Sequence, residues 1–393
     1  MPKAQRIAFV CPRFAEGGTV GGAETLLKNL ADRAAAAGRQ VDFLTTCAQS
    51  HFTWENTLPP GRRRIGNLEV HYFPVDSRDA SSFLRVQQAI CQRGNFTPPD
   101  EELWIRNSVN STPLCEHLRQ HGDDYDRIVM GPYLFGLVYF AAQIHPNKTL
   151  LVPCLHDEPF AWLSIMHNLF GGVDGFLFNT EPEQDLARRL FQVPAEKCAV
   201  VGMGLEPFEA DPRAFVARHK LNSPYVMYAG RREPLKGTPL LCDYVDAFRQ
   251  RTGRDVKIVF TGSGQIDAPP DLQPHILDLG FVSEQEKREA MAGAAVFIHP
   301  SVNESLGIVL LESWLAKTPA LVHTRSEVLR WQCAQSNAGL WFANYPEFEE
   351  ELRLLLEEAP LRNAMGAAGR EYVQRIYSWP SVEKRLFEAL DKT

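Results

Sequence analysis

The chain has 393 residues, more than a single compact core usually accommodates, so we expect two or three domains. Hydrophobic residues make up 45% of it and charged residues 23%, values that exclude a disordered, collagen-like or coiled-coil protein. Lysine and arginine number 41 against 48 aspartates and glutamates, and the resulting net charge of −7 argues against a nucleic-acid partner.

Short apolar runs alternate with helical patterns along the whole chain, as they do in parallel sheets with crossover helices. In the first half we expect helices at 24–37 and 182–190, and strands at 7–10, 41–44, 68–73, 127–130, 150–153, 175–178 and 199–201. The stretch 76–126 is polar with isolated aromatic residues, which predicts helices inserted into the first sheet. We expect this insertion to carry a feature specific to this protein.

The helical and strand patterns weaken from 206 to 224, and a second series begins at 225. We expect its helices at 238–251, 284–292 and 306–316, and its strands at 225–229, 257–261, 276–279, 295–299 and 320–323. The sequence therefore predicts an α/β protein with two tandem Rossmann-like, doubly wound domains, at 1–206 and 207–378. We expect an amphipathic helix within 379–393 to pack back onto the first domain.

The eight cysteines are nowhere spaced as C-x-x-C, so we expect buried free thiols in a reducing compartment and no zinc or redox site. Near the N-terminus only four apolar residues follow one another, at 7–10, which does not suit a secretory signal. The longest run without charge or histidine, 128–144, is too short to span a membrane. We therefore expect a cytoplasmic protein.

Two patterns approach metal-site motifs without matching them. Asp124 and Asp126 have D-x-D spacing, but they precede a strand instead of following one. His117 and His121 lie four apart, but leucine stands where the H-E-x-x-H motif has its glutamate. The sequence therefore predicts no metal site.

Ligands of open parallel sheets bind beyond the carboxyl ends of the strands, where loops lead into helices. The first such loop, 17–24, is rich in glycine, and near Gly22 it opens a helix whose free amides suit a phosphate or a sugar. It does not match G-x-G-x-x-G, so a dinucleotide site is not indicated. A plain flexible loop is the alternative.

The loop 230–237 follows the first strand of the second series. Its Arg231, a planar fork, and its Lys236, a point charge, would together suit a diphosphate. The loop does not match the Walker A motif, so an NTPase is not indicated. A solvated basic turn is the alternative.

The stretch 300–312 holds two carboxylates. Glu304 precedes a helix whose first turn we expect at 305–308, and Glu312 lies inside that helix among leucines. A carboxylate in such surroundings needs a partner, for example a polyol. The amides that open the helix would face a phosphate, and they belong to Gly307, Ile308 and Val309. For Glu304 the alternative is a role as helix cap.

His156 follows a strand of the first domain and could contact a reacting sugar, although a lone histidine is as often structural. Gly262 follows one strand of the second domain, and Phe281 and Val282 follow the next. These strand ends could flank a nucleotide base, with ordinary packing as the alternative.

In this order, the motifs resemble those of the retaining glycosyltransferases of family 4, and the resemblance covers nearly the whole chain. Its most specific part is the E-x7-E pair of Glu304 and Glu312, embedded in P-S-x-x-E-S-L-G-I-V-L-L-E. Arg231 and Lys236 match the G-R-x-x-x-x-K-G loop, and His156 matches the histidine of the acceptor-domain loop. The N-terminal G-G-x-E is matched by Gly21, Gly22 and Glu24.

The resemblance implies the GT-B architecture, two Rossmann-like domains facing a central cleft, and metal-independent transfer from a nucleoside diphosphate sugar with retention of anomeric configuration. It implies no cofactor. The implied catalytic residues are Glu304, His156, Arg231 and Lys236. Besides Glu304 and the two cations, the implied donor-binding residues are Gly22, Gly262, Phe281, Val282, Gly307, Ile308, Val309 and Glu312. Glu312 would bind the ribose, Glu304 the donor sugar, and His156 the sugar or the transition state.

The acceptor that the resemblance implies is a glycan or a lipid-linked saccharide in surface polysaccharide synthesis. Arginines at 62–64 and within 83–93 lie near apolar side chains, so peripheral contact with the inner face of the membrane stays open. The alternative is a solvated arginine turn together with a helix that faces the core. A nucleotide-sugar epimerase or hydrolase and a non-catalytic sugar-binding protein are alternatives on the same fold. Residues 305–306, 317 and 323–327 depart from the family pattern, so base and sugar are not assigned.

Overall fold

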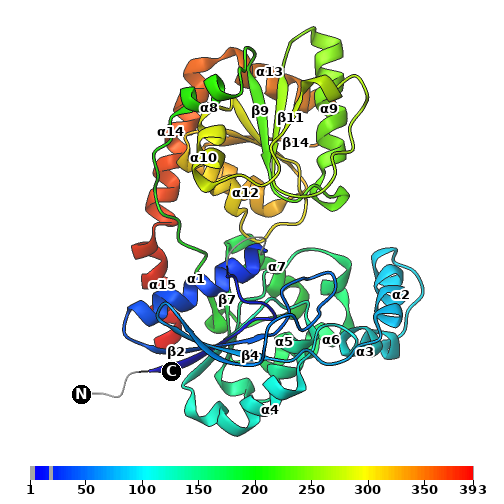
Figure 1. Cartoon of the computed structure of the whole chain (residues 1–393), viewed down its shortest axis with the longest axis vertical. Helices are drawn as coiled ribbons and strands as arrows, with labels where there is room; N and C mark the ends of the chain where they lie inside the picture. Colours follow the sequence, from blue (N-terminus) through cyan, green and yellow to red (C-terminus); the bar gives the residue numbers. More distant parts are fainter. Residues whose placement is uncertain (1–4, 17–20, 393) are drawn as a thin grey trace. The chain divides into compact units, whose positions relative to one another are not determined.

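The computed structural model describes residues 5–16 and 21–392, and the chain divides into two compact units (Figure 1). The first contains Met1–Met203 and Val382–Thr393, and the second contains Gly204–Ser381. Each unit is built on one mainly parallel sheet with helices between its strands, so the predicted α/β class with two Rossmann-like sheets is confirmed. In the described ranges no helix is both long enough and apolar enough to cross a membrane.

The first sheet has eight strands in the order β3-β4-β2-β1-β5-β6-β7-β8, parallel except for β3. Their bounds are β1 (Arg6–Val10), β2 (Gln40–Thr46), β3 (Gly61–Ile65), β4 (Leu68–Phe73), β5 (Arg127–Met130), β6 (Thr149–Leu151), β7 (Gly175–Phe178) and β8 (Cys198–Val200). Strand β1 lies in the middle, and four of its five residues are fully buried, because helices cover both faces of a parallel sheet. The order of the strands reverses between β1 and β5.

The arginine run at 61–64 is part of β3, so it is solvated as the alternative held, but it forms a strand and not a turn. The strand pairs antiparallel with β4, with Arg63 opposite Val70, and it forms the edge of the sheet. All three arginines are exposed, so no apolar alternation marks this strand in the sequence. Charged side chains on an edge strand discourage pairing with other chains.

The helices of the first unit follow the strands in chain order (Figure 1). The α-helices are α1 (Gly22–Ala36), α2 (Ala80–Cys91), α3 (Pro98–Arg106), α4 (Thr112–His121), α5 (Gly136–Ala141), α6 (Ser164–Gly172) and α7 (Glu181–Phe191). The 3₁₀ turns are η1 (Gly122–Asp124), η2 (Pro146–Lys148), η3 (Pro159–Trp162) and η4 (Ala195–Lys197).

Helices α2, α3 and α4 lie within the stretch expected to be an insertion. Their apolar side chains belong to the main core of the first unit, among them Val86, Trp104 and Leu118. Side chains of Asp79 and Ser111 cap α2 and α4, and Thr97 opens α3 with a capping box. The insertion is therefore a packed part of its unit.

The second sheet has six parallel strands in the order β11-β10-β9-β12-β13-β14. Their bounds are β9 (Tyr225–Ala229), β10 (Lys257–Thr261), β11 (Ile276–Asp278), β12 (Val296–His299), β13 (Ala320–His323) and β14 (Gly339–Phe342). The chain runs outward from β9 to β11 and then returns to the other side of β9, so the strand order reverses between β9 and β12. Strand β14 was not expected from the sequence.

The helices of this unit are α8 (Pro212–Arg218), α9 (Thr238–Thr252), α10 (Glu284–Gly293), α11 (Ile308–Leu315), α12 (Glu327–Ser336), α13 (Tyr345–Glu357) and α14 (Ala359–Ile376), with 3₁₀ turns η5 (Pro234–Lys236) and η6 (Gln273–His275). The last helix, α15 (Trp379–Asp391), begins in the second unit and runs into the first. In the first unit its Glu383 pairs with Arg33 at 3.3 Å, and its Arg385 donates to the carbonyl of Val201 at 3.0 Å.

Helix α14 packs so closely on the end of α11 that a side chain at Gly366 has no room. A Cβ at this position would lie 2.0 Å from the carbonyl oxygen of Lys317. We expect Gly366→Ala to destabilise the protein by about 1–3 kcal/mol through overpacking, lowering the urea midpoint followed by circular dichroism. Gly171 in α6 is the matched control, because no atom lies within 4 Å of a Cβ built there. An equal midpoint for Gly366→Ala and Gly171→Ala would contradict the close packing.

Candidate active site

The predicted residues of the second unit gather at the carboxyl edge of its sheet. Arg231 and Lys236 follow β9, Gly262 follows β10, and Glu304 follows β12. Since β9 lies between β10 and β12, these three loops are neighbours at the place where the strand order reverses. Ligands of open α/β sheets bind at this place.

An ion pair joins the loops that follow β9 and β12. Lys236 Nζ lies 2.7 Å from Glu304 Oε1, and both side chains are partly buried. The imidazole of His299, the last residue of β12, approaches the same carboxylate, with Nε2 3.6 Å from Oε1. The structure therefore brings together two residues predicted from the sequence and a histidine that was not predicted.

His299 is buried, and burial lowers the pKa of its imidazole to about 4, so the ring is neutral at pH 7. Its Nδ1 atom has no hydrogen-bond partner among the described residues. In the sequence its signal is a single polar residue that ends an otherwise apolar strand. Such a position leads directly into the ligand side of a parallel sheet.

Glu312, inside α11, is partly buried and faces Lys287 of α10, with Nζ 3.1 Å from Oε1. Burial raises the pKa of this carboxyl, and the Lys287 ammonium opposes the shift. The second oxygen, Oε2, finds no hydrogen-bond donor within the described part of the chain. A buried polar atom left without a partner is typical of a site that a ligand completes. Lys287 was not predicted, because it lies among other charged residues of a helix whose sequence is typical of a solvent-exposed face.

Helix α11 begins at Ile308, so the prediction of a first turn at 305–308 is wrong. Gly307 stands before the helix in the left-handed region at φ 78°, and a Cβ there would lie 2.6 Å from the side chain of Leu329. The amides of Ile308 and Val309 are therefore in the first turn and have no acceptor within the helix. Gly307, and not Glu304, occupies the N-cap position of α11.

The two arginines of the loop after β9 differ in their surroundings. Arg231 is exposed and lies 3.2 Å from Glu233. Arg232, which was not predicted, is buried; it pairs with Asp278 and donates to the carbonyl of Gly264 at 2.7 Å. Arg231 is thus placed to meet a ligand, whereas Arg232 joins the loops after β9, β10 and β11.

Gly262 allows two of these loops to approach each other. Its φ is 112°, and a Cβ would lie 2.2 Å from the carbonyl oxygen of Gly230. Beyond β11, Phe281 is 66% exposed and Val282 is partly buried. An exposed aromatic ring at the carboxyl edge is available to a planar group.

In the first unit, Gly22 is the first residue of α1, and the preceding residues 17–20 lie outside the described ranges. Glu24 is buried and pairs with Arg13, whose Nε lies 3.0 Å from Oε1. The glutamate of the N-terminal motif therefore holds the loop after β1 onto α1, because a buried charge requires such a partner.

His156 lies beyond β6 and is partly exposed. Its Nδ1 is 3.4 Å from Glu158 Oε1, and the hydroxyl of Tyr133 donates to the same oxygen at 3.0 Å. Glu158 thus orients the imidazole so that Nε2 is left for another contact. Neither Glu158 nor Tyr133 was predicted from the sequence.

The two patterns that were set aside as metal sites have partners within the protein. Asp126 accepts the backbone amide of Arg6 at 2.7 Å, and Asp124 lies 3.7 Å from the Arg6 guanidinium. The rings of His117 and His121 are 4.7 Å apart. Within residues 5–16 and 21–392 no group of three or more His, Cys, Asp or Glu is placed to hold a metal ion.

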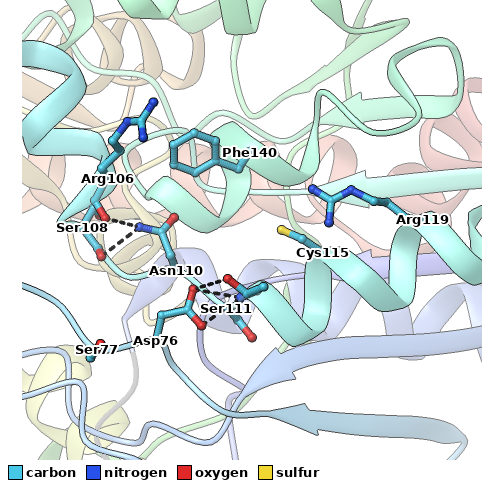
Figure 2. Close-up of a pocket in the computed structure, with 10 residues that line it drawn as sticks. Asp76, Ser77, Arg106, Ser108, Asn110, Ser111, Cys115, Arg119 and Phe140 are labelled. Atoms are coloured by element: carbon cyan, nitrogen blue, oxygen red, sulfur yellow. Dashed lines mark hydrogen bonds between the residues drawn. The ribbon is translucent and has the colours of Figure 1, made fainter. Parts of the chain in front are cut away.

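A pocket of about 280 Å³ lies in the inserted part of the first unit (Figure 2). Asp76, beyond β4, accepts from the amide and the hydroxyl of Thr112 and so caps α4, while the Asn110 amide donates to three nearby carbonyls. Figure 2 shows Arg106 and Arg119 on opposite sides of Phe140. These hydrogen bonds shape the loop before α4.

Two Rossmann-like units, one with a cation and two glutamates beyond the strands of its sheet, are the arrangement predicted for a glycosyltransferase with GT-B architecture. The protein is a glycosyltransferase, as predicted. Residues 211–372 match the family model of glycosyl transferases group 1.

Relatives of similar length carry the same activity in their names. The D-inositol 3-phosphate glycosyltransferase of Stackebrandtia nassauensis is 25% identical over 402 residues, covering 95% of this chain and 87% of the relative. The alpha-D-kanosaminyltransferase of Streptomyces kanamyceticus is 28% identical over 294 residues, covering 67% and 74%.

Solved structures share the fold across the whole chain. An E. coli trehalose-6-phosphate structure bound with UDP-2-fluoro glucose has a TM-score of 0.74 at 14% identity, with 99% of each chain covered. Anabaena HepE in complex with UDP and glucose has a TM-score of 0.69 at 16% identity, covering 98% of this chain and 99% of HepE.

The neutral, buried His299 makes the stability of the protein depend on pH. An unfolded histidine takes up its proton near pH 6.5, but the folded one only near pH 4. The neutral imidazole therefore contributes fully to the free energy of unfolding above pH 6.5, and about 3 kcal/mol of it is lost as the pH falls from 6.5 to 4. We expect His299→Gln to lose less stability than the wild type over this interval in urea unfolding. Parallel pH profiles for the two proteins would contradict the assignment.

Proposed function

We propose that this glycosyltransferase moves a hexosyl group from a nucleoside diphosphate sugar to an acceptor hydroxyl, with retention of anomeric configuration and without a metal ion. The observation that carries the proposal is the buried Oε2 of Glu312, which has no partner in the described structure and lies on the helix that follows the loop of Glu304. A ribose hydroxyl would supply the missing hydrogen bond, and a diphosphate would meet the cation and the amides.

We assign the phosphates, the sugar and the base of the donor to different loops of the second unit. Lys236 and Arg231, with the amides of Ile308 and Val309, would bind the two phosphates. Glu304 would hold the donor sugar, and the neutral His299 beside it would help to orient its carboxylate. The nucleotide base would lie at the strand ends marked by Gly262, Phe281 and Val282.

Breaking the bond from the anomeric carbon to the diphosphate develops negative charge on phosphate and positive charge on the sugar. Cations and amides already in place would stabilise the leaving group without reorganisation, which is a large contribution in a site that excludes water. The leaving phosphate would accept the proton of the acceptor hydroxyl on the same face, since the motifs offer no carboxylate as a covalent nucleophile. His156, oriented by Glu158, would contact the sugar or the transition state.

For the acceptor we propose a glycan or a lipid-linked saccharide in surface polysaccharide synthesis. We propose that the protein is cytoplasmic and that it can contact the inner face of the membrane peripherally. The exposed arginines of β3 support that contact. A second candidate acceptor is an inositol phosphate, because relatives that align with nearly the whole chain are named D-inositol 3-phosphate glycosyltransferases.

The nucleotide is tested by a thermal-shift panel of UDP, GDP and ADP. A ligand at about 100 times its dissociation constant adds about 2.7 kcal/mol to the folded state. The matching nucleotide sugars are then offered with and without saccharide acceptors, and the anomeric configuration of the product is read by NMR. Conversion of the donor alone would indicate an epimerase or hydrolase, and nucleotide binding with no turnover on any acceptor would indicate a sugar-binding protein.

Calorimetric titration separates the phosphate contacts from the ribose contact. Lys236→Ala should weaken binding of the preferred nucleoside diphosphate by about 1.5–3 kcal/mol and leave the free nucleoside unaffected, because the lost cation faces phosphate. Glu312→Gln should weaken both ligands, because the ribose is common to them. Arg251→Ala, at an exposed pair with Glu349, is the control. Equal weakening of nucleoside and diphosphate by Lys236→Ala would remove Lys236 from the phosphate site.

Chelation tests the proposed charge stabilisation by protein groups. We expect EDTA to leave the transfer rate unchanged, because a cation pair and helix amides take the role of a divalent ion at the diphosphate. Inactivation by EDTA that Mn²⁺ reverses would contradict a metal-independent mechanism.

A further inference from the structure

The turn that follows the His156 loop exposes a large aromatic side chain. Trp162 ends η3 and is 61% exposed, although most tryptophans of the chain are buried or partly buried. Two features indicate that this exposure serves binding. A hydrogen bond holds the indole ring, and side chains of the inserted helices pack against the turn η3.

The indole of Trp162 is attached to the residue next to His156. Its Nε1 donates to Asp157 Oδ1 at 2.9 Å, and Arg189 of α7 lies 3.3 Å from the other oxygen of Asp157. The polar edge of the ring is therefore satisfied within the protein, and the apolar face is what remains for a ligand. Asp157 and Arg189 are themselves half exposed and form a polar rim.

The insertion of the first unit supports the turn. Phe160, two residues before Trp162, stacks on Trp104 of α3 at 5.1 Å and 10°, and Trp104 stacks in turn on Phe83 of α2 at 6.0 Å and 11°. Glu101 of α3 accepts from the hydroxyl of Ser164 at 2.7 Å and so holds the start of α6. The turn that carries Trp162 is thus supported by stacked aromatic rings, and helices inserted between β4 and β5 set its position.

A pyranose ring is the ligand that this surface fits. One face of a pyranose carries C–H groups of partial positive charge, which the negative face of an indole attracts, and its rim carries hydroxyls. Asp157 would accept from such hydroxyls, and Arg189 would donate to them. An acyl chain offers no hydrogen-bonding group to the half-exposed Asp157 and Arg189 and would displace water from both, which disfavours a lipid tail at this place.

We propose that Trp162, with Asp157 and Arg189 at its rim, is an acceptor subsite that stacks a pyranose ring beside His156. The acceptor is then a saccharide, whether free or lipid-linked, and not an inositol phosphate recognised by its phosphate alone. This inference rests on the proposed function, since the acceptor has meaning only for a transferase.

Saturation-transfer NMR measures the subsite directly, with methyl β-D-glucopyranoside and methyl α-D-mannopyranoside as probes. We expect saturation of the sugar C–H protons in the wild type, about a tenfold weaker affinity in Trp162→Ala, and recovery of most of the affinity in Trp162→Phe. Trp341→Ala is the matched control, because Trp341 lies on β14 of the second unit and is 38% exposed. Sugar signals that are absent in the wild type, or equal in Trp162→Ala and Trp341→Ala, would overturn the subsite.

A kinetic readout separates the subsite from the proposed function. Once the donor is known, Trp162→Ala should raise KM for a saccharide acceptor about tenfold and leave KM for the donor unchanged. Transfer with an unchanged acceptor KM would overturn the subsite and leave the proposed function intact. Trp162-dependent sugar binding without any transfer would overturn the proposed function, and with it the acceptor role, while confirming that Trp162 binds a saccharide. Flotation with liposomes that is lost in Trp162→Ala, with no saccharide binding, would identify a lipid surface and overturn the subsite.

Discussion

The burial of both sheets on both faces is the constraint on which the rest of the structure depends. Strands such as β1, β9 and β12 are apolar along nearly their whole length, because helices cover them above and below. Polar chemistry is thereby confined to the edges where strands end. His299 is an example, since it is the last residue of an apolar strand and its imidazole faces the carboxylate of Glu304.

Buried charges then divide into two kinds. Arg13 with Glu24, and Arg232 with Asp278, hold loops together through ion pairs, although the Nε of Arg232 has no hydrogen-bond partner in the described structure. Glu312 instead joins two helices, because it pairs with Lys287 of α10 and leaves its buried Oε2 without a donor in the described structure. A buried oxygen without a donor is costly, and the proposed function assigns it a ligand hydroxyl.

The first unit carries helices that are inserted into its sheet. Helices inserted between β4 and β5 extend the core and support the turn beyond His156 through stacked rings. The sheet of this unit is of a kind common to many enzymes, and the inserted helices form part of the surroundings of the loop that carries His156. This division agrees with the general finding that a fold hosts many activities and that sites decide among them.

The sequence by itself determined the strands with strong apolar runs and clear ends, such as those at 68–73, 127–130 and 225–229, because burial on both faces demands such runs. It also predicted Lys236 and Glu304 in loops that follow neighbouring strands, and the structure pairs the two. Only the tertiary structure decided the edge strand β3, the start of α11 at Ile308, and the partners Lys287, Arg232 and His299. The physical reason is that ladder pairing, a left-handed glycine and a charge partner depend on residues distant in the chain, which no local pattern records.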